Sequence, residues 1–269
     1  MVLFPNAKIN IGLNVVEKRA DGFHNIETVF YPVGLSDILE INTWHKMIFK
    51  NTGLTVENRS FESNLCHKAY QLLQQDYSLD PVNMHLHKIT PFGAGLGGGS
   101  SDASFTLKSL NHLFSLNLDQ KTLIHYAERL GSDCPFFIIN KPAYAEGKGE
   151  NLEETDISLK GHYLVLIHPG IHINTAKAYS QITPTKPKTN IKELIRQPLE
   201  KWKESIQNDF EESVFKNHPE LKAVKEELYA LGAVYASMSG SGSAIYGIFN
   251  DKINLKSRFQ DYFIWTQYL

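Results

Sequence analysis

The chain has 269 residues, of which 42% are hydrophobic and 21% charged, and its formal net charge is −2. This is ordinary globular composition for one or two domains, and the near balance of charge argues against a nucleic-acid or membrane-surface partner. Cys66 and Cys134 lack metal-ligand spacing, which argues against a disulfide framework or a zinc site. The informative pattern begins by Asn6 and no apolar run approaches the roughly 18 residues of a transmembrane helix, so we expect a cytoplasmic protein without a targeting segment.

The first part of the chain predicts strands and one helix. Residues 6–16 alternate between apolar and polar side chains, with Lys8, Asn10 and Asn14 on the polar face of the predicted strand. A turn at Arg19–Gly22 precedes a returning strand. The further elements are strands at 23–33, 37–41, 46–51 and 82–90, and a helix at 64–75.

A glycine-rich loop is the most informative feature of the sequence. It consists of Pro91, Phe92, Gly93, Ala94, Gly95, Leu96, Gly97, Gly98, Gly99, Ser100 and Ser101. Without Cβ atoms in the way, its backbone N–H groups can approach a phosphate closely, and the dipole of a following helix adds positive charge. We therefore predict phosphate binding. A flexible linker or a tight turn is the alternative, but linkers rarely open directly into an amphipathic helix.

The segments around the loop exclude two common nucleotide motifs. Ala103, Leu107 and Leu110 recur at helical spacing, and Ser100 to Asp102 suit the N-cap and first turn of that helix. The loop has no lysine at the Walker A position. Residues 82–90 alternate like a half-exposed antiparallel strand, whereas the strand of a dinucleotide-binding fold is a continuous apolar run.

The rest of the chain completes the first domain and predicts a second domain of mixed structure. Residues 118–130 predict a helix closed by Gly131. Because residues 151–158 are polar and acidic, we place domains at 1–150 and 151–269. Strands are predicted at 136–139, 144–146, 162–168 and twice within 233–249, helices at 174–182, 191–195, 199–202, 209–214 and 220–231, and a surface loop at 183–190. The segregation of strands and helices favours an α+β fold.

The candidate residues for chemistry are open to two interpretations each. Lys8 is either a solvated strand lysine or part of a polar pocket with Asn10, since Asn is disfavoured on strands. Asp133 is either a helix N-cap before Pro135 or a functional carboxylate. Residues 239–244 form either a hairpin turn or a second phosphate contact.

Three aromatic or imidazole side chains have the same two interpretations. Phe23 and His24 follow the Arg19–Gly22 turn, and Tyr179 lies in the predicted helix after Asn174. Side chains of these types are more often used for packing or exposed on the surface than for binding a ligand, so the residues alone do not assign them a role.

The order of these segments resembles the GHMP kinase superfamily. Its members share an N-terminal strand segment, a glycine-rich phosphate loop and a late Gly-Ser-Gly turn, which here are residues 6–14, 91–101 and 239–244. Residues 6–14 and 19–27 together, with 91–101, 130–137 and 145–150, further resemble the family that phosphorylates 4-diphosphocytidyl-2-C-methyl-D-erythritol. The resemblance extends from Asn6 to about Phe249.

The resemblance implies a fold and a reaction. The fold would combine an N-terminal domain like the second domain of ribosomal protein S5 with a ferredoxin-like C-terminal domain, with the active site in the cleft between them. The reaction would transfer the γ-phosphoryl group of ATP to the 2-hydroxyl of the substrate, in the non-mevalonate (methylerythritol phosphate) pathway of isoprenoid synthesis. Mg²⁺ is expected with ATP; its ligands are unassigned, with Ser101 a candidate.

The resemblance also implies roles for single residues. Asp133 matches the catalytic base, Lys8 the catalytic lysine, and Asn10 a contact to the erythritol end. His24 matches the histidine that reads cytosine, between rings that match Phe23 and Tyr179. The departures from the family are Phe23, where a tyrosine is frequent, and Ser132 and Cys134 beside the aspartate.

Other functions compete with this interpretation. A homoserine or mevalonate kinase would share the loop, but Phe23 and His24 argue against it. A nucleotide-binding regulator without catalysis is disfavoured by the presence of both Lys8 and Asp133, and a decarboxylase of the same fold by the cytidine-site residues. We expect a small-molecule substrate and a monomer or weak homodimer.

Overall fold

The computed structural model describes residues 1–54, 61–255 and 258–269 and divides into two compact units. Unit 1 comprises Met1–Lys8, Gly34–Phe92 and Gly97–Lys141, and unit 2 comprises Ile9–Val33, Gly93–Leu96 and Pro142–Leu269. The units therefore interleave along the sequence. The assignment of domains to residues 1–150 and 151–269 stays a prediction, and the α+β class is confirmed.

Unit 1 contains one sheet and a group of helices. Its elements are β1 (Val2–Leu3), β4 (Ile38–Thr43), β5 (Ile48–Gly53), η1 (Phe61–Ser63), α1 (Leu65–Asp76), β6 (Val82–Lys88), α2 (Gly98–Leu113), α3 (Gln120–Glu128) and α4 (Cys134–Ile139). The strand order is β1-β4-β6-β5. Strand β6 alternates between buried and half-buried residues and pairs antiparallel with β4, as predicted, but parallel with β5.

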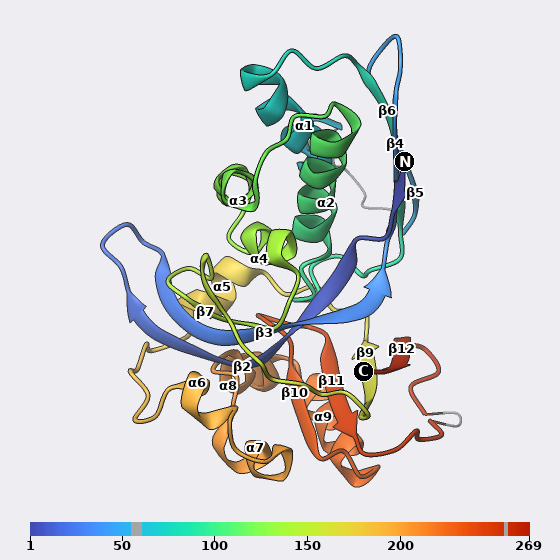
Figure 1. Cartoon of the computed structure of the whole chain (residues 1–269). Coiled ribbons are helices and arrows are strands. Elements are labelled where there is room, and N and C mark those ends of the chain that lie inside the picture. The colour runs from blue at the N-terminus through green and yellow to red at the C-terminus, as the bar shows by residue number, and fades with distance from the viewer. Residues whose placement is uncertain (55–60, 256–257) are drawn as a thin grey trace. The chain divides into compact units, whose positions relative to one another are not determined.

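The core of unit 1 lies between this sheet and its helices. Leu39 and Met84 from the strands pack with Leu107 and Leu110 of α2, and all four side chains are fully buried. Figure 1 shows α1 and α2 on the same side of the sheet. The spacing of apolar residues after the glycine loop is thus the spacing of a core-facing helix.

Two predictions for the helices of unit 1 are wrong. Residues 136–139 are not a strand, because they belong to α4, which has Pro135 in its first turn and ends at Asn140 in the left-handed region. A run of four apolar residues does not separate a strand from a buried helix by its periodicity. Helix α3 ends at Glu128 with Arg129 as its C-cap, before the predicted Gly131.

Unit 2 contains two sheets. Its elements are β2 (Asn6–Lys18) and β3 (His24–Ser36), which lie mainly in this unit, β7 (Ala143–Glu146), β8 (Asn151–Glu154), β9 (Tyr163–His168), α5 (Thr175–Ser180), α6 (Ile191–Leu194), α7 (Leu199–Ser205), α8 (Phe210–Asn217), α9 (Pro219–Ala230), β10 (Tyr235–Met238), β11 (Ile245–Phe249) and β12 (Phe263–Tyr268). The strand orders are β2-β3-β7-β8 and β10-β11-β9-β12.

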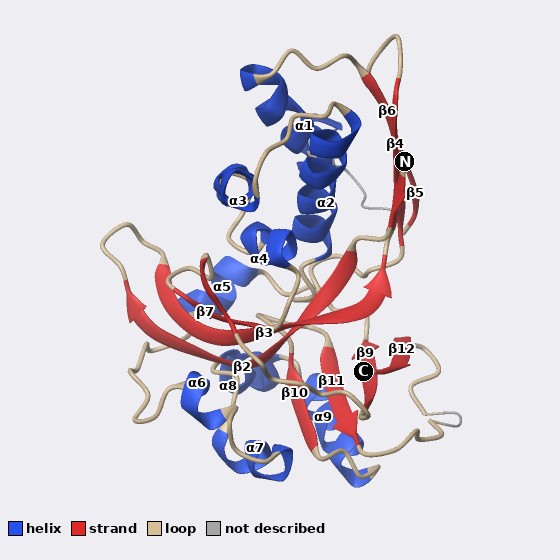
Figure 2. Cartoon of the chain, in the orientation of Figure 1, coloured by secondary structure: helices blue, strands red, loops and turns tan. Residues whose placement is uncertain are grey.

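The second of these sheets carries the core of unit 2. All residues of β9 are buried, and α9 packs against β10 and β11 (Figure 2). Strand β12, which the sequence analysis missed, pairs antiparallel with β9. Strand β8 lies within residues 151–158, the polar and acidic segment used to place the domain boundary, and pairs with β7. Among the helices of the described residues, none combines the length and apolar character needed to cross a membrane.

Candidate functional site

The glycine-rich loop adopts a backbone that requires glycine. Gly93, Gly95 and Gly97 have φ values of +60°, +77° and +69°. A Cβ on Gly95 would lie 1.9 Å from the carbonyl oxygen of Ser239, and a Cβ on Gly97 would lie 3.2 Å from Cε of Lys8. Since other residues rarely adopt a positive φ, both the conformation and the close contacts explain the glycines.

Helix α2 begins directly at the end of this loop. Gly97 occupies the N-cap position in the left-handed conformation, and the Ser101 N–H donates to the Gly97 carbonyl at 2.9 Å. The predicted N-cap role of Ser100 to Asp102 is therefore wrong, because all three residues lie within the helix, with Ser100 in its first turn. The N–H groups of Gly98, Gly99 and Ser100 precede the helical hydrogen-bond ladder, which leaves donors suited to an anion.

Lys8 and Asp133 form an ion pair within unit 1. Lys8 Nζ lies 3.3 Å from Asp133 Oδ2, with the lysine side chain 3% exposed and the aspartate side chain 28% exposed. Asp133 occupies the N-cap position of α4, but its side chain makes no capping hydrogen bond. The structure thus places the carboxylate against the Lys8 ammonium, where solvent and a second molecule can reach it.

Side chains of α2 hold α4 and its aspartate in place. The Ser104 hydroxyl donates to the Cys134 carbonyl at 2.8 Å, and Lys108 Nζ donates to the Phe137 carbonyl at 2.6 Å. Burial lowers the pKa of Lys108 to about 8. The helix that starts at the phosphate loop therefore also fixes the position of Asp133.

A second group of charges lies at the base of the loop, and sequence reasoning missed it. Lys88 contacts Asp37 and Asp102, with 2.6 Å between Lys88 Nζ and Asp102 Oδ2. All three side chains are buried. Burial raises the pKa of Asp102 to about 7, because desolvation and the Asp37 charge outweigh the attraction of Lys88.

We expect Asp102→Asn to change the pH dependence of stability. Between about pH 4 and 7 the folded protein binds a proton that the unfolded chain releases, so this group makes the free energy of unfolding fall as pH rises. The variant lacks this group, so its free energy of unfolding relative to wild type should rise by about 1 kcal/mol per pH unit from about pH 5 to 7. Urea unfolding at several pH values measures the difference, and parallel curves would contradict the expectation.

In unit 2, Asn10 belongs to a network around the Gly-Ser-Gly turn that joins β10 to β11. Asn10 Nδ2 donates to the Thr28 hydroxyl at 3.0 Å, and the Asn10 backbone N–H donates to Ser239 Oγ at 3.2 Å. The Ser239 hydroxyl in turn donates to the Gly95 carbonyl at 2.8 Å. The turn is thus a hairpin connection that also supports the phosphate loop, and a contact of its own with phosphate stays a prediction.

The predicted cytosine residues also lie in unit 2. The rings of His24 and Tyr179 are stacked with 4.8 Å between centroids and 17° between planes. The rings of Tyr179 and Phe210 pack edge to face with 4.8 Å between their centroids. Phe23 is 58% exposed, and Lys148 Nζ lies over its ring. Burial lowers the pKa of His24, and the positive charge of Lys18 lowers it further by a smaller amount, so the His24 ring is neutral at pH 7. The predicted placement of cytosine between Phe23 and Tyr179 stays a prediction.

Ser101 is the loop residue that fits an oxygen ligand for a metal ion. Its hydroxyl is buried and has no hydrogen-bond partner among residues 1–54, 61–255 and 258–269. The same part of the chain has no cluster of three or more His, Cys, Asp or Glu side chains arranged for a metal. These residues fit an ion bound chiefly through phosphate oxygens, as is usual for Mg²⁺ with nucleotides.

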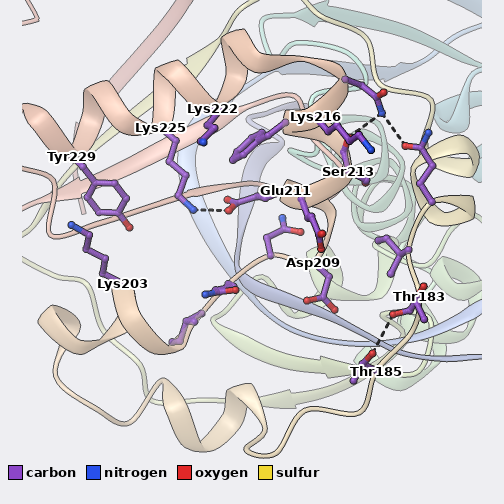
Figure 3. Close-up of a pocket in the computed structure, with 18 residues that line it drawn as sticks. Thr183, Thr185, Lys203, Asp209, Glu211, Ser213, Lys216, Lys222, Lys225 and Tyr229 are labelled. Atoms are coloured by element: carbon purple, nitrogen blue, oxygen red, sulfur yellow. Dashed lines mark hydrogen bonds and ion pairs between the residues drawn. The ribbon is translucent and has the colours of Figure 1, made fainter.

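A groove of about 1270 Å³ lies elsewhere in unit 2, between the segment after α5 and helices α8 and α9 (Figure 3). Two of its lysines have partners in the groove, since Lys225 Nζ lies 2.5 Å from Glu211 Oε2 and Lys203 Nζ lies over the Tyr229 ring. None of the predicted site residues lines it.

Two family models match the chain. The GHMP kinases N terminal domain matches residues 64–141, and the GHMP kinases C terminal model matches residues 190–264. The first match includes the glycine loop and Asp133.

Curated relatives and solved structures agree with these matches. The chain is 49% identical to a 4-diphosphocytidyl-2-C-methyl-D-erythritol kinase from Parabacteroides distasonis, over 98% of each chain. It is 51% identical to the kinase of that name from Bacteroides fragilis, over 93% of this chain and 92% of the relative. A crystal structure of 4-(cytidine 5'-diphospho)-2C-methyl-D-erythritol kinase aligns with a TM-score of 0.79 and 32% identity, covering 92% of this chain and 90% of that one. The mevalonate kinase of Methanococcus jannaschii, at TM-score 0.69 and 12% identity over 99% of this chain and 97% of its own, shares the fold.

Proposed function

The chain belongs to the 4-diphosphocytidyl-2-C-methyl-D-erythritol kinase family of GHMP kinases, and on this premise we propose that it phosphorylates the 2-hydroxyl of that substrate with ATP. The product would be the 2-phosphate, an intermediate of the non-mevalonate isoprenoid pathway, together with ADP. The observation that supports this most directly is the Lys8–Asp133 ion pair, which lies beside the phosphate loop. The closeness is shown by Gly97 of the loop, where a Cβ would lie 3.2 Å from Lys8 Cε.

The reaction needs a base, a held phosphate and a positioned hydroxyl. Asp133 accepts the proton of the substrate 2-hydroxyl while the oxygen of that hydroxyl attacks the γ-phosphorus of ATP. The bond between the γ-phosphorus and the β–γ bridging oxygen breaks, and ADP leaves. The Lys8 ammonium orients the hydroxyl and offsets the negative charge that develops beside the carboxylate. Catalysis of this kind depends on placement and charge, which a buried lysine at a fixed distance provides.

The loop from Pro91 to Ser101 binds the triphosphate of ATP through its N–H groups and the start of α2. Bound Mg²⁺ would offset charge on the β- and γ-phosphate oxygens, with the unpartnered hydroxyl of Ser101 as the protein ligand. In unit 2, His24 forms hydrogen bonds to the edge of cytosine, and Phe23 and Tyr179 offer ring faces for stacking. Because His24 now covers one face of Tyr179, cytosine takes the place of the His24 ring on that face. Asn10 contacts the erythritol end.

His24→Ala should raise the KM for the cytidine substrate by about 10- to 100-fold, because the edge of cytosine loses its hydrogen-bond partner, which costs about 1–3 kcal/mol. The KM for ATP should change little, because His24 has no part in phosphate binding. Steady-state kinetics with each substrate varied in turn measures the two constants. His125→Ala, on an exposed face of α3, is the matched control. An increase in the KM for ATP alone would remove the cytosine role of His24.

The test of the function is an ADP-release assay with ATP, Mg²⁺ and 4-diphosphocytidyl-2-C-methyl-D-erythritol, run beside homoserine and mevalonate. Turnover of the cytidine substrate alone supports the proposal. Activity only on another alcohol would keep the phosphate loop and discard the roles of Phe23, His24 and Tyr179. ATP binding without turnover of any acceptor would favour a nucleotide-binding regulator.

A further inference from the structure

A buried ion cluster joins the segment that enters the phosphate loop to the helix that leaves it. Lys88 is the last residue of β6, three positions before Pro91, and Asp102 follows Ser101 at the other end of the loop. Lys88 Nζ lies 2.6 Å from Asp102 Oδ2 and also contacts Asp37 Oδ2. The lysine side chain is 1% exposed, so these contacts are shielded from water.

Asp37 extends the cluster to the backbone of the entering segment. Its Oδ1 atom accepts hydrogen bonds from the Ile89 N–H at 2.6 Å and from the Thr90 N–H at 2.8 Å. The Asp37 carboxylate thus binds two consecutive peptide N–H groups and the Lys88 ammonium. These contacts fix the direction of the chain as it enters the loop at Pro91.

Gly98, within the loop, also lies close to the residues that enter it. A Cβ on Gly98 would lie 2.9 Å from Cγ2 of Thr90 and 3.3 Å from Lys88 Nζ. The Lys88 ammonium lies 5.2 Å from the centroid of the Phe92 ring, so a residue of the loop itself packs on the cluster. A side chain at position 98 would therefore collide with Thr90, so the residues that follow β6 and the start of α2 leave no room for one there.

We propose that Asp37, Lys88 and Asp102, the loop clasp, are positioning residues that hold the ends of the phosphate loop at the separation needed to bind ATP. The inference rests on the proposed function, because it takes the loop as the phosphate site. A loop with several positive-φ glycines has large conformational freedom, and tying its ends removes much of it before the nucleotide arrives. Buried ion pairs add little stability over apolar packing but fix geometry, as this role requires.

The test compares two substitutions of Asp102. In Asp102→Ala the Lys88 ammonium loses its partner in α2, and we expect the Kd for ATP and the KM for ATP to rise about 10-fold or more, with kcat and the KM of the cytidine substrate changing less. In Asp102→Asn an amide oxygen still accepts from Lys88, and both constants for ATP should stay within about twofold of wild type. Glu40→Ala, on the exposed side of β4, controls for loss of a carboxylate in the same unit.

The measurements separate the clasp from the function on which it rests. Calorimetry with ATP and Mg²⁺ alone needs no phosphoryl acceptor, so it tests the clasp even if the cytidine compound is not turned over. If the wild-type protein turns over the cytidine substrate and Asp102→Ala has an unchanged Kd for ATP, the clasp is overturned and the proposed function stands.

Loss of ATP affinity in Asp102→Asn equal to that in Asp102→Ala would also overturn the clasp, because the hydrogen bond would then not be the cause. If the alanine variant does not fold, Asp102→Ser, whose hydroxyl is too short to reach Lys88, is measured in its place. Faster hydrogen exchange of the loop amides in the folded variant is the accompanying expected result.

Discussion

Asp133→Asn is expected to lower kcat by about 10²- to 10⁴-fold, the contribution typical of a positioned general base. The amide keeps the shape of the side chain and its oxygen can still face Lys8, so the fold and the Kd for ATP should be retained. Asp133 makes no capping hydrogen bond in α4, which removes the main structural reason for a loss of stability. Single-turnover phosphorylation of the cytidine substrate, with calorimetry for ATP, measures both quantities.

Asp119→Asn is the matched control for this substitution. Asp119 caps α3 through the Thr122 N–H, is exposed, and can be replaced by asparagine, which caps helices equally well. Its kcat should equal that of wild type. An unchanged kcat in Asp133→Asn would remove Asp133 from the mechanism and return it to a structural role.

Gly95→Ala should disrupt the phosphate loop. Its Cβ would lie 1.9 Å from the Ser239 carbonyl oxygen, a backbone atom that cannot rotate away, and its φ of +77° is strained for alanine by about 1–2 kcal/mol. A displacement of about 1 Å in a site that positions a reacting group can cost about 100-fold in activity. We expect kcat/KM for ATP to fall by that order, measured by steady-state kinetics.

Gly99→Ala is the comparison for the loop, because among the residues that the structure describes its Cβ would meet only Leu65 Cδ1, at 3.8 Å. Gly99 lies in the first turn of α2, where alanine is the better helix former by about 0.5–1 kcal/mol. The melting temperature should therefore be maintained or rise in Gly99→Ala and fall in Gly95→Ala. Equal stability of the two variants would mean that the turn at Ser239 yields to the added methyl group.

The features that the sequence predicts well depend on patterns among residues that are close together in the sequence. The alternation at residues 6–16 produced β2, and the apolar spacing after the glycine loop produced α2. The glycine pattern reflects backbone conformation, which Gly93, Gly95 and Gly97 adopt. In each case the physical cause acts within a few residues, so it is visible in the order of the side chains.

The features that were missed depend on residues far apart in the chain. Asp102 looked like a first-turn helix charge, and only the fold brings it to Lys88 and to Asp37, 65 positions earlier. Strand β12 pairs with β9, about 100 residues before it. The two strands are not joined by a turn, so no local turn sequence indicates that they pair. The short apolar run at 136–139 fits a strand or a helix equally, and its packing against α2 decides between them.

The interleaving of the two units sets an order for folding during synthesis. All residues of unit 1 have been made once the ribosome has passed Lys141, whereas the strand partner of β3 in unit 2, β7, begins only at Ala143. The edge of β3 that later pairs with β7 therefore stays unpaired while more than a hundred further residues are synthesised. An unpaired strand edge can form hydrogen bonds with strands of other chains. A fragment that ends shortly after residue 141 would contain all residues of the first unit, and its β2–β3 hairpin would lack the partner strand β7 and be prone to aggregate.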